Sequence, residues 1–379
     1  MDEIRSRMLE DLRGVIDGDL FFDPLQRATY SVDSSLYQID PLGVVVPRHE
    51  DDVRNTLRYA LEHEIPVHPR GSGTGLAGES LGRGLILDFS RHFRRILSLD
   101  GSQATVQSGV ILDRLNDELA PLNRRIAPDP SGSQTCTMGG LIASNSSGAR
   151  SIRHGTTADH VTSMRVMFAN GEIAVLEPRS WPRDEPDHSE PGFLRGLERK
   201  VATLVNWHND ALTLDTVRAP RNRAGYALKE VRRSDGDMDL GRLVVGSEGT
   251  LAIVLESTWR VIPRPLAQGV VLLPFSRLVE AAAAVPDCMI EAPAACDLHD
   301  YRSLGLLREA LPEFAGWEVG RAEAALVVLF EDDDPRRVEE KLDTVTLRLL
   351  RRGVLVSEPI TTLRRSECER MLALRRRIM

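Results

Sequence analysis

Four glycines within eight residues form the stretch of this chain best suited to binding a ligand. The stretch reads Pro69-Arg70-Gly71-Ser72-Gly73-Thr74-Gly75-Leu76-Ala77-Gly78 and follows a short apolar run at 65–68 that predicts a strand. Glycine enters left-handed backbone conformations freely, so such a loop can turn several N–H groups toward one anion. A phosphate or pyrophosphate suits the loop, and an ordinary glycine-rich turn is the alternative.

Two common phosphate motifs do not describe this loop. A Walker A loop is excluded because no Gly-Lys-Ser/Thr sequence follows. Gly71, Gly73 and Gly75 begin a G-x-G pattern, but the third glycine of the dinucleotide fingerprint is misplaced and no clear amphipathic helix follows. The loop by itself therefore leaves its ligand open.

Two further stretches share this small-residue character. Residues 127–161 are rich in Gly, Ser, Thr and Asn, yet they include Met138, Leu141 and Ile142, which a flexible linker does not need. Residues 244–254 place another small-residue turn between two strand-like runs. Small side chains allow a backbone to press against a flat ligand, so the three stretches together predict one distributed site.

Taken in order, the three stretches resemble the FAD-binding domain of the vanillyl-alcohol oxidase/PCMH superfamily. They are most similar to the branch of D-lactate dehydrogenases, the glycolate oxidase D subunit and D-2-hydroxyglutarate dehydrogenases. The motifs that carry the resemblance are the glycine loop, then Pro-Asp-Pro with Met-Gly-Gly-Leu-Ile-Ala-Ser-Asn-Ser-Ser-Gly-Ala-Arg-Ser, then Gly-Ser-Glu-Gly-Thr-Leu. The Asn-Ser-Ser-Gly-Ala-Arg-Ser variant resembles large members that fuse the flavin domain to an iron–sulfur region. The resemblance covers essentially the whole chain, most strongly up to about Pro265.

The resemblance implies non-covalent FAD, with its pyrophosphate held by backbone amides of the glycine loop. Relatives with a histidyl flavin carry His within this loop, where the present chain has none. Cys136 lies near the position of a cysteinyl link in some distant relatives, and a packed free thiol is the alternative. The implied cofactor-binding residues are Arg70, Gly71, Ser72, Gly73, Thr74, Gly75, Leu76, Pro128, Asp129, Thr137, Gly139, Gly140, Ser144, Asn145, Gly148, Gly155, Val161, Glu248, Gly249 and Ile253.

Several of these positions also have a purely structural interpretation. Ser144 and Asn145 suit a turn or a helix cap. Glu248 could bind a hydroxyl of FAD or brace the late turn. Gly155 and Val161 match the family's segment near the adenosine.

The resemblance also implies three residues on the substrate side. Asn222 and Tyr226 belong to a segment similar to the family's Asn-x-x-Gly-Tyr at the active-site face, although Tyr226 could instead be a core aromatic. Arg375 follows Leu374 as in a family Leu-Arg pair whose guanidinium holds a substrate carboxylate with two parallel donors. A surface arginine is the alternative, and the tryptophan that often precedes the pair is absent here.

The nine histidines are scattered without an H-x-x-x-H pair, so we expect no metal site. In the related branch, a later histidine-rich motif binds a divalent metal and supplies the proton-abstracting base. That motif would lie past Met379, so we expect the base outside this chain.

The amino-acid composition limits which binding partners and which cellular compartment we expect for the protein. The net charge of -8 disfavours nucleic acid, and the arginine clusters are expected to be solvated helix faces. Four cysteines without C-x-x-C spacing predict reduced thiols in the cytoplasm. The sequence contains no apolar run of membrane-spanning length, which leaves peripheral association with the inner face of a membrane open.

Periodicity and breakers predict an α+β chain. The resemblance implies a PCMH-type FAD-binding domain over 1–264, with subdomains of about 1–98 and 99–264. Pro263-Arg264-Pro265 predicts a hinge, and the elements beyond it suggest a β-α-β type cap. The resemblance implies that residues 265–379 form an α/β ferredoxin-like cap domain. We expect this cap to be incomplete, without a terminal strand, and the chain to be a fragment. The predicted elements are helices at 1–18, 51–64, 112–122, 194–212, 277–285 and 335–352, strands at 43–47, 65–68, 84–89, 104–110, 251–262, 270–273 and 325–330, and a hairpin over 161–176.

The predicted function is FAD-dependent oxidation of a D-2-hydroxy acid of the D-lactate, D-2-hydroxyglutarate or glycolate class, with hydride transfer to flavin N5. The expected electron acceptor is an iron–sulfur domain or subunit, or another acceptor. One alternative is another oxidase or reductase of the same flavin fold. The other is a truncated FAD-binding protein without turnover.

Overall fold

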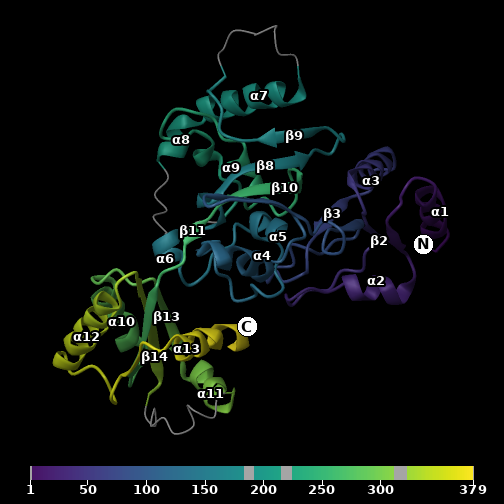
Figure 1. Cartoon of the computed structure of the whole chain (residues 1–379). Helices are drawn as coiled ribbons and strands as arrows, with labels where there is room; N and C mark the ends of the chain where they lie inside the picture. Colours follow the sequence, from purple (N-terminus) through teal and green to yellow (C-terminus); the bar gives the residue numbers. More distant parts are fainter. Residues whose placement is uncertain (1, 183–191, 215–223, 311–321, 379) are drawn as a thin grey trace. The chain divides into compact units, whose positions relative to one another are not determined.

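The computed structural model describes residues 2–182, 192–214, 224–310 and 322–378 (Figure 1). Its chain divides into two compact units. The first unit contains Met1–Ala127, Gly132–Ser146 and Thr156–Ile262, and the second contains Pro128–Ser131, Ser147–Gly155 and Pro263–Met379. Two short segments of the second motif stretch therefore pack with the C-terminal part of the chain. The domain boundary near residue 264 stays a prediction.

A four-stranded sheet begins the first unit, in the order β1-β2-β4-β3. Strands β2, β4 and β3 are parallel, and β1 is antiparallel to β2. Residues of β2 alternate between two cores, since Val45 packs with the apolar residues of α1 and α3 while Val44 and Val46 face the other side. The elements are α1 (Asp2–Arg13), β1 (Asp19–Phe21), α2 (Pro24–Tyr30), β2 (Gly43–Val46), α3 (Glu50–Glu62), β3 (Val67–Arg70) and β4 (Leu85–Asp88).

Helix α3 links β2 to β3 and so leads the chain toward the glycine loop. Its first turn carries three carboxylates, which the positive end of the helix dipole favours. Val53, Leu57 and Ala60 are buried, as predicted, but Leu61 is 63% exposed because it lies one position, about 100° of rotation, beyond Ala60. Helix α1 ends at Arg13, earlier than predicted, and leaves Val15 outside the core.

The second sheet of the first unit is antiparallel throughout, in the order β5-β6-β10-β8-β9. The predicted hairpin is confirmed: Asn170-Gly171 joins β8 to β9, and Gly171 takes the positive φ of 80° that this turn requires. Helices α4, α5 and α7 contribute to the core of this sheet. The elements are β5 (Ile96–Leu99), β6 (Gln103–Gln107), α4 (Leu112–Leu119), α5 (Met138–Ala143), β8 (Val161–Met167), β9 (Ile173–Leu176), α7 (Phe193–Trp207) and β10 (Ile253–Arg260).

Shorter elements connect these strands and helices. They are η1 (Ala120–Leu122), β7 (Arg124–Arg125), α6 (Ser151–His154), η2 (Thr157–Asp159), α8 (Asn209–Thr213), η3 (Leu228–Val231), α9 (Gly241–Val244) and β11 (Ile262–Pro263). Among the helices that the structure describes, none has the length and apolar character needed to cross a lipid bilayer.

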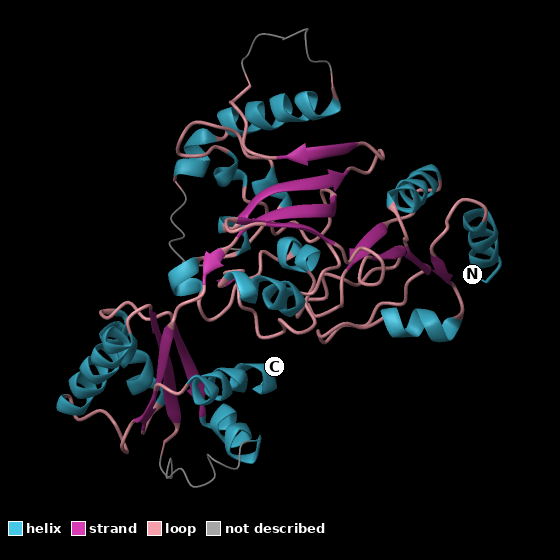
Figure 2. Ribbon diagram, viewed as in Figure 1, coloured by secondary structure: helices cyan, strands magenta, loops and turns pink. Residues whose placement is uncertain are grey.

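The second unit is built on an antiparallel sheet in the order β13-β14-β12-β15, which is the ferredoxin-like arrangement expected from the sequence. Helices α10 and α12 cover one face of this sheet, and α11 and α13 cover the other (Figure 2). Successive side chains of β12 alternate between the two faces of the sheet. The elements are β12 (Ala267–Phe275), α10 (Leu278–Met289), β13 (Ala295–Asp300), α11 (Tyr301–Ala310), β14 (Ala324–Asp332), α12 (Pro335–Arg351), β15 (Ile360–Thr362) and α13 (Arg365–Ile378).

The prediction that this sheet lacks a terminal strand is wrong. Residues of β15 pair with β12, where Val270 lies opposite Thr362 and Leu272 opposite Ile360. Three residues after a proline carry too little periodicity to indicate a strand. Its pairing partner lies about 90 positions earlier in the chain and became evident only in the fold.

Candidate functional site

The glycine loop begins where β3 ends, and the Arg70 side chain fixes its base. The Arg70 guanidinium donates hydrogen bonds to the carbonyl oxygens of Tyr30, at 3.3 Å, and Val32, at 2.8 Å. It also lies over the Tyr30 ring, 5.4 Å from the ring centre. Two of the five guanidinium N–H donors of Arg70 therefore hold the neighbouring turn.

The loop itself offers a row of backbone donors. Within the described residues, the N–H groups of 72–76 donate to no acceptor of the protein. Gly73 takes a φ of 67°, a left-handed conformation that suits glycine. Successive unpaired N–H groups in such a turn form a concave site for an anion, which fits the phosphate interpretation of the loop.

The second motif stretch forms α5, and its first turn packs directly against the loop. The Thr137 hydroxyl caps this helix by accepting a hydrogen bond from the Gly140 N–H at 3.2 Å. A Cβ at Gly71 would lie 2.2 Å from the Thr137 Oγ1, so only glycine permits this contact. The Ser72 hydroxyl donates to the Thr135 carbonyl and ties the loop to the same segment.

The third motif stretch docks on the end of α5. The N–H groups of Gly246 and Glu248 donate to the carbonyl oxygens of Ile142, at 2.8 Å, and Ala143, at 2.9 Å. Gly249 has a φ of 76°, and a Cβ there would lie 2.4 Å from the Pro69 ring. The late turn therefore lies directly against the residue that begins the glycine loop.

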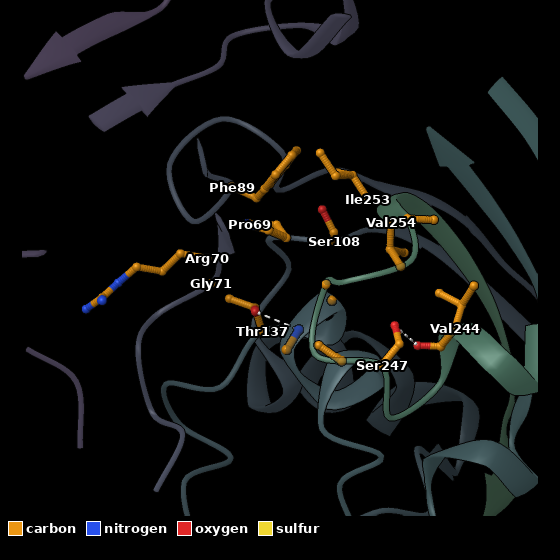
Figure 3. A pocket seen from close by; sticks show the side chains of 15 residues that line it. Pro69, Arg70, Gly71, Phe89, Ser108, Thr137, Val244, Ser247, Ile253 and Val254 are labelled. Carbon is orange, nitrogen blue, oxygen red and sulfur yellow. Dashed lines mark hydrogen bonds between the residues drawn. The ribbon is translucent and has the colours of Figure 1, made fainter. Parts of the chain in front are cut away.

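These three stretches enclose a cavity of about 60 Å³ in the first unit (Figure 3). This volume is far below that of a complete cofactor site, so the cavity accounts for only part of a ligand. Among the predicted cofactor residues, those that line it are Arg70, Gly71, Thr137, Gly139, Gly140, Gly249 and Ile253. Further lining residues, absent from the prediction, are Pro69, Phe89, Ser108, Ala143, Val244, Ser247, Ala252 and Val254.

Ser108 and Ser247 are the polar residues of this wall that sequence reasoning missed, and the Ser247 hydroxyl donates to the Val244 carbonyl at 2.8 Å, whereas Ser108 is different. It is 4% exposed, and its hydroxyl has no hydrogen-bond partner among the residues of the described chain. In the sequence, Gln107-Ser108-Gly109 reads as the end of an ordinary alternating strand, so no local signal marks it. A buried hydroxyl without a partner, beside glycines that leave room for a ligand, fits the presence of a polar cofactor such as FAD.

Three predicted residues near the cavity also have partners within the protein. The Ser144 hydroxyl donates to the Gly140 carbonyl at 2.9 Å, and the Asn145 side-chain oxygen accepts from the Ala158 N–H at 3.0 Å. Both residues therefore stabilise a helix cap or a turn, in addition to any contact with a ligand. The exposed Glu248 has a φ of 54°, so its backbone shapes the late turn.

Tyr226 is not a core aromatic, because 52% of it is exposed. Its hydroxyl shares a 2.8 Å hydrogen bond with the Thr250 hydroxyl, which in turn donates to the Ser247 carbonyl at 2.6 Å. The ring is thereby attached to the late turn of the cavity. Of its predicted companions, Asn222 lies outside the described residues. Arg375 lies in α13, and its side chain is likewise not described.

Four predicted cofactor residues, namely Pro128, Asp129, Gly148 and Gly155, belong to the second unit. Asp129 accepts hydrogen bonds from Arg150, at 3.1 Å from its backbone N–H and 2.7 Å from its guanidinium. A Cβ at Gly148 would lie 2.0 Å from the Asp129 carboxylate, so glycine is required beside it. Val161, at the start of β8, belongs to the first unit and does not line the cavity.

Arg150 also connects these loops to β14. Its Nε donates to the Glu331 carboxylate at 2.8 Å, and Glu331 is only 2% exposed. The guanidinium of Arg153 donates to the Glu331 carbonyl at 2.9 Å. Arg150 of the Ala-Arg-Ser motif therefore has a structural role in the second unit, and the sequence analysis did not predict this role.

Cys136 shows no sign of an activated thiol. It is 7% exposed, and burial, with a smaller contribution from Asp113, raises its pKa to about 12. The thiol therefore stays protonated at neutral pH, whereas the thiolate is the reactive species. This finding favours the packed-thiol alternative over a cysteinyl flavin.

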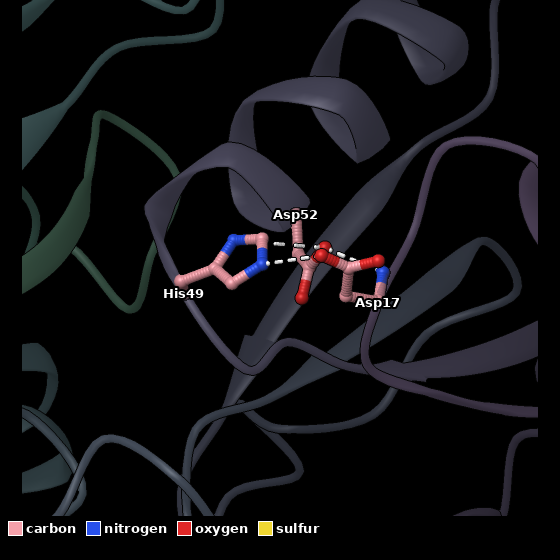
Figure 4. A group of neighbouring side chains, drawn as sticks. All are labelled: Asp17, His49 and Asp52. Carbon is pink, nitrogen blue, oxygen red and sulfur yellow. Dashed lines mark hydrogen bonds and ion pairs between the residues drawn. The ribbon is translucent and has the colours of Figure 1, made fainter.

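A separate group of polar side chains lies at the start of α3 (Figure 4). The ligand atoms of Asp17, His49 and Asp52 lie within 4.8 Å of one another. Asp52 is fully buried, and its two oxygens accept hydrogen bonds from the backbone N–H groups of Asp17, at 2.8 Å, and Arg48, at 2.7 Å. Capping of the chain at the helix start accounts for this arrangement.

His49 in this group should make stability depend on pH. Its 2.9 Å hydrogen bond with Asp17 raises its pKa above the ordinary 6.5, and the Asp52 carboxylate adds to the effect. The stabilisation should be complete below pH 6.5 and should be lost as the pH rises through the raised value. Because the ring is about half exposed, we expect roughly 0.2–1 kcal/mol. Thermal melts of His49→Gln and wild type across pH 5–9 should differ most at acidic pH, and a constant difference would contradict this assignment.

Comparison with known proteins places this geometry in context. Residues 41–177 match the FAD binding domain, and residues 264–379 match the C-terminal domain of FAD linked oxidases. The chain is 31% identical over 345 residues to D-2-hydroxyglutarate dehydrogenase of Pantoea ananatis, a match covering 88% of this chain and 34% of that protein. It is 29% identical over 331 residues to glycolate oxidase subunit GlcD of Bacillus subtilis, covering 83% of this chain and 56% of that protein. The chain thus spans about a third of the length of the dehydrogenase.

A solved structure of alkyldihydroxyacetonephosphate synthase has a similar fold. Its TM-score is 0.65 at 17% identity, and the match covers 98% of this chain and 63% of that protein. The likeness supports the two-domain α+β fold of FAD-linked oxidases. By these matches the chain combines an FAD binding domain with the C-terminal domain of FAD linked oxidases, and its relatives include D-2-hydroxyglutarate dehydrogenases, glycolate oxidase subunits GlcD and a D-lactate dehydrogenase.

Proposed function

We propose that this chain holds non-covalent FAD and forms the cofactor-binding part of an enzyme that oxidises a D-2-hydroxy acid. The single observation that carries the proposal is the cavity of the first unit, where the glycine loop with its unpaired N–H groups meets glycines of two later stretches. The names of the relatives support the class of acid: D-2-hydroxyglutarate, D-lactate or glycolate.

Each part of the site has a defined task in this proposal. The N–H groups of 72–76 bind the diphosphate, because anions are favoured where several backbone donors converge. Tyr226, whose hydroxyl is hydrogen-bonded to that of Thr250, contacts the substrate in this proposal. Asn222 and Arg375 keep the roles that the resemblance implies, which are a substrate contact and an ion pair with the substrate carboxylate. Bound FAD supplies the two-electron acceptor for the hydride on the substrate's α-carbon.

The remaining expectations on partners and location are also part of the proposal. Electrons leave through an iron–sulfur domain or subunit, or another acceptor. The four free cysteines agree with a reducing cytoplasm. Association with the inner face of a membrane stays a prediction.

An absorbance spectrum of the purified chain, taken before and after acid precipitation, tests the cofactor. We expect two flavin bands, in the near-ultraviolet and the blue, and we expect the flavin in the acid supernatant. Flavin in the pellet would overturn the non-covalent assignment. A colourless protein that also fails to bind added FAD would refute the proposal as a whole.

Anaerobic addition of D-lactate, D-2-hydroxyglutarate or glycolate to the FAD-loaded chain tests the chemistry. Bleaching of the blue band by a D-acid, with L-lactate as the control, would support oxidation of D-2-hydroxy acids. Stable FAD binding without bleaching by any of these acids would restrict the function of this chain to holding the cofactor.

A further inference from the structure

Ser108 occupies a fixed position between β10 and α5 of the first unit. Its N–H donates to the Leu255 carbonyl of β10 at 3.0 Å, and its carbonyl accepts from the Gly139 N–H of α5 at 2.7 Å. A Cβ at Gly139 would lie 2.8 Å from the Ser108 Cβ, so the two backbones are in close contact. The direction of the Ser108 side chain is therefore set by hydrogen bonds on both sides of it.

The hydroxyl itself is left without a partner. At 4% exposure its residue is withdrawn from solvent, and within the described chain no donor or acceptor reaches its oxygen. The oxygen points toward the side of the cavity lined by Pro69, Phe89 and Ile253, which offer it no polar side chain (Figure 3). Burying a hydroxyl without a hydrogen bond is unfavourable, and such groups in folded proteins usually meet a ligand or an ordered water.

We propose that the Ser108 hydroxyl is a hydrogen-bonding contact of the bound FAD and positions it in the cavity. This inference rests on the FAD binding proposed above. A hydroxyl suits the task because it can donate and accept, as the polar atoms of the cofactor require. Because the serine backbone is already held by Leu255 and Gly139, its ordering is complete before the cofactor arrives.

The proposal predicts that Ser108→Ala keeps or raises the thermal stability of the FAD-free chain and weakens its binding of FAD. Ser108→Ala removes an unpaired buried hydroxyl, so the melting temperature of the FAD-free chain should stay the same or rise by about 1–3 °C. The same change removes a contact to FAD, so the dissociation constant should rise about tenfold, equivalent to about 1.4 kcal/mol. A residue with a merely structural role would not raise the FAD-free melting temperature while weakening cofactor binding.

Ser133 provides a matched control. It is also buried, at 5% exposure, and its hydroxyl also has no partner among the described residues, but it does not line the cavity. Ser133→Ala should leave the melting temperature unchanged or raised, as in Ser108→Ala, without changing FAD affinity. Ser108→Cys, which keeps a similar size but offers only a weak donor, should lie between alanine and wild type in affinity.

The experiment is a titration of the FAD-free full chain with FAD, followed by quenching of flavin fluorescence, together with thermal melts without FAD. Wild type is titrated first, and its failure to bind would count against the proposed function itself. Wild-type binding with an unchanged dissociation constant in both Ser108→Ala and Ser108→Cys would overturn the role of Ser108. Weaker binding by Ser133→Ala to the same extent would overturn it as well.

Discussion

Replacing Arg150 with methionine should destabilise the second unit by about 3–5 kcal/mol, since it removes a charged partner of two carboxylates. Glu331 is nearly inaccessible to water, and Asp129 is largely covered, so water cannot replace the guanidinium. Hydrogen exchange followed by mass spectrometry should show at least a hundredfold faster exchange in peptides from β14. This readout is local, which matters because a chain of two units need not unfold in a single step.

Arg337→Met is the matched control for this prediction. Arg337 belongs to the same unit, but its side chain is 68% exposed and lies 4.0 Å from Asp332, so its loss should change little. Arg150→Lys should fall between the two, because one ammonium cannot reproduce the separate Nε and Nη contacts of the guanidinium. Wild-type exchange rates in Arg150→Met would show that Glu331 and Asp129 are stabilised without it.

Replacing Gly249 with alanine should weaken FAD binding at least tenfold and lower stability by about 2–5 kcal/mol. The positive φ of 76° accounts for about 1–2 kcal/mol of this loss. The added Cβ, 2.4 Å from the Pro69 ring, accounts for about 1–3 kcal/mol more because one of the two backbones must move. Pro69 begins the glycine loop, so that movement reaches the residues that receive the cofactor. Fluorescence titration with FAD and thermal melts measure the two effects.

Gly236→Ala separates backbone strain from the steric contact. Gly236 has a φ of 90°, yet a Cβ there would meet nothing within 4 Å. Its replacement should cost about 1–2 kcal/mol and leave FAD affinity unchanged. Equal losses of stability and affinity in the two variants would argue against contact between Gly249 and Pro69 as the cause.

Sequence patterns indicated most of the main elements of the fold. The apolar spacing of α12 and the continuous apolar run of β14 are strong local signals, and both elements lie close to their predicted positions. The strand β15 was not predicted because three residues give too short a sequence pattern. Leu61 was wrongly assigned to the buried face of α3 because the predicted apolar stripe was too wide. Such errors arise because tertiary pairing, rather than local propensity, decides short strands and helix ends.

The sequence by itself determined which residues could meet a phosphate-bearing cofactor, because glycine runs encode backbone freedom locally. Tertiary structure decided which of them share one cavity. It brought Gly71 to Thr137 and Gly249 to Pro69, and it placed the hydroxyl of Ser108 in the wall of that cavity. It also joined Arg150 to Glu331, which are 181 positions apart. Contacts at such separations depend on strand order and packing, and no local pattern specifies them.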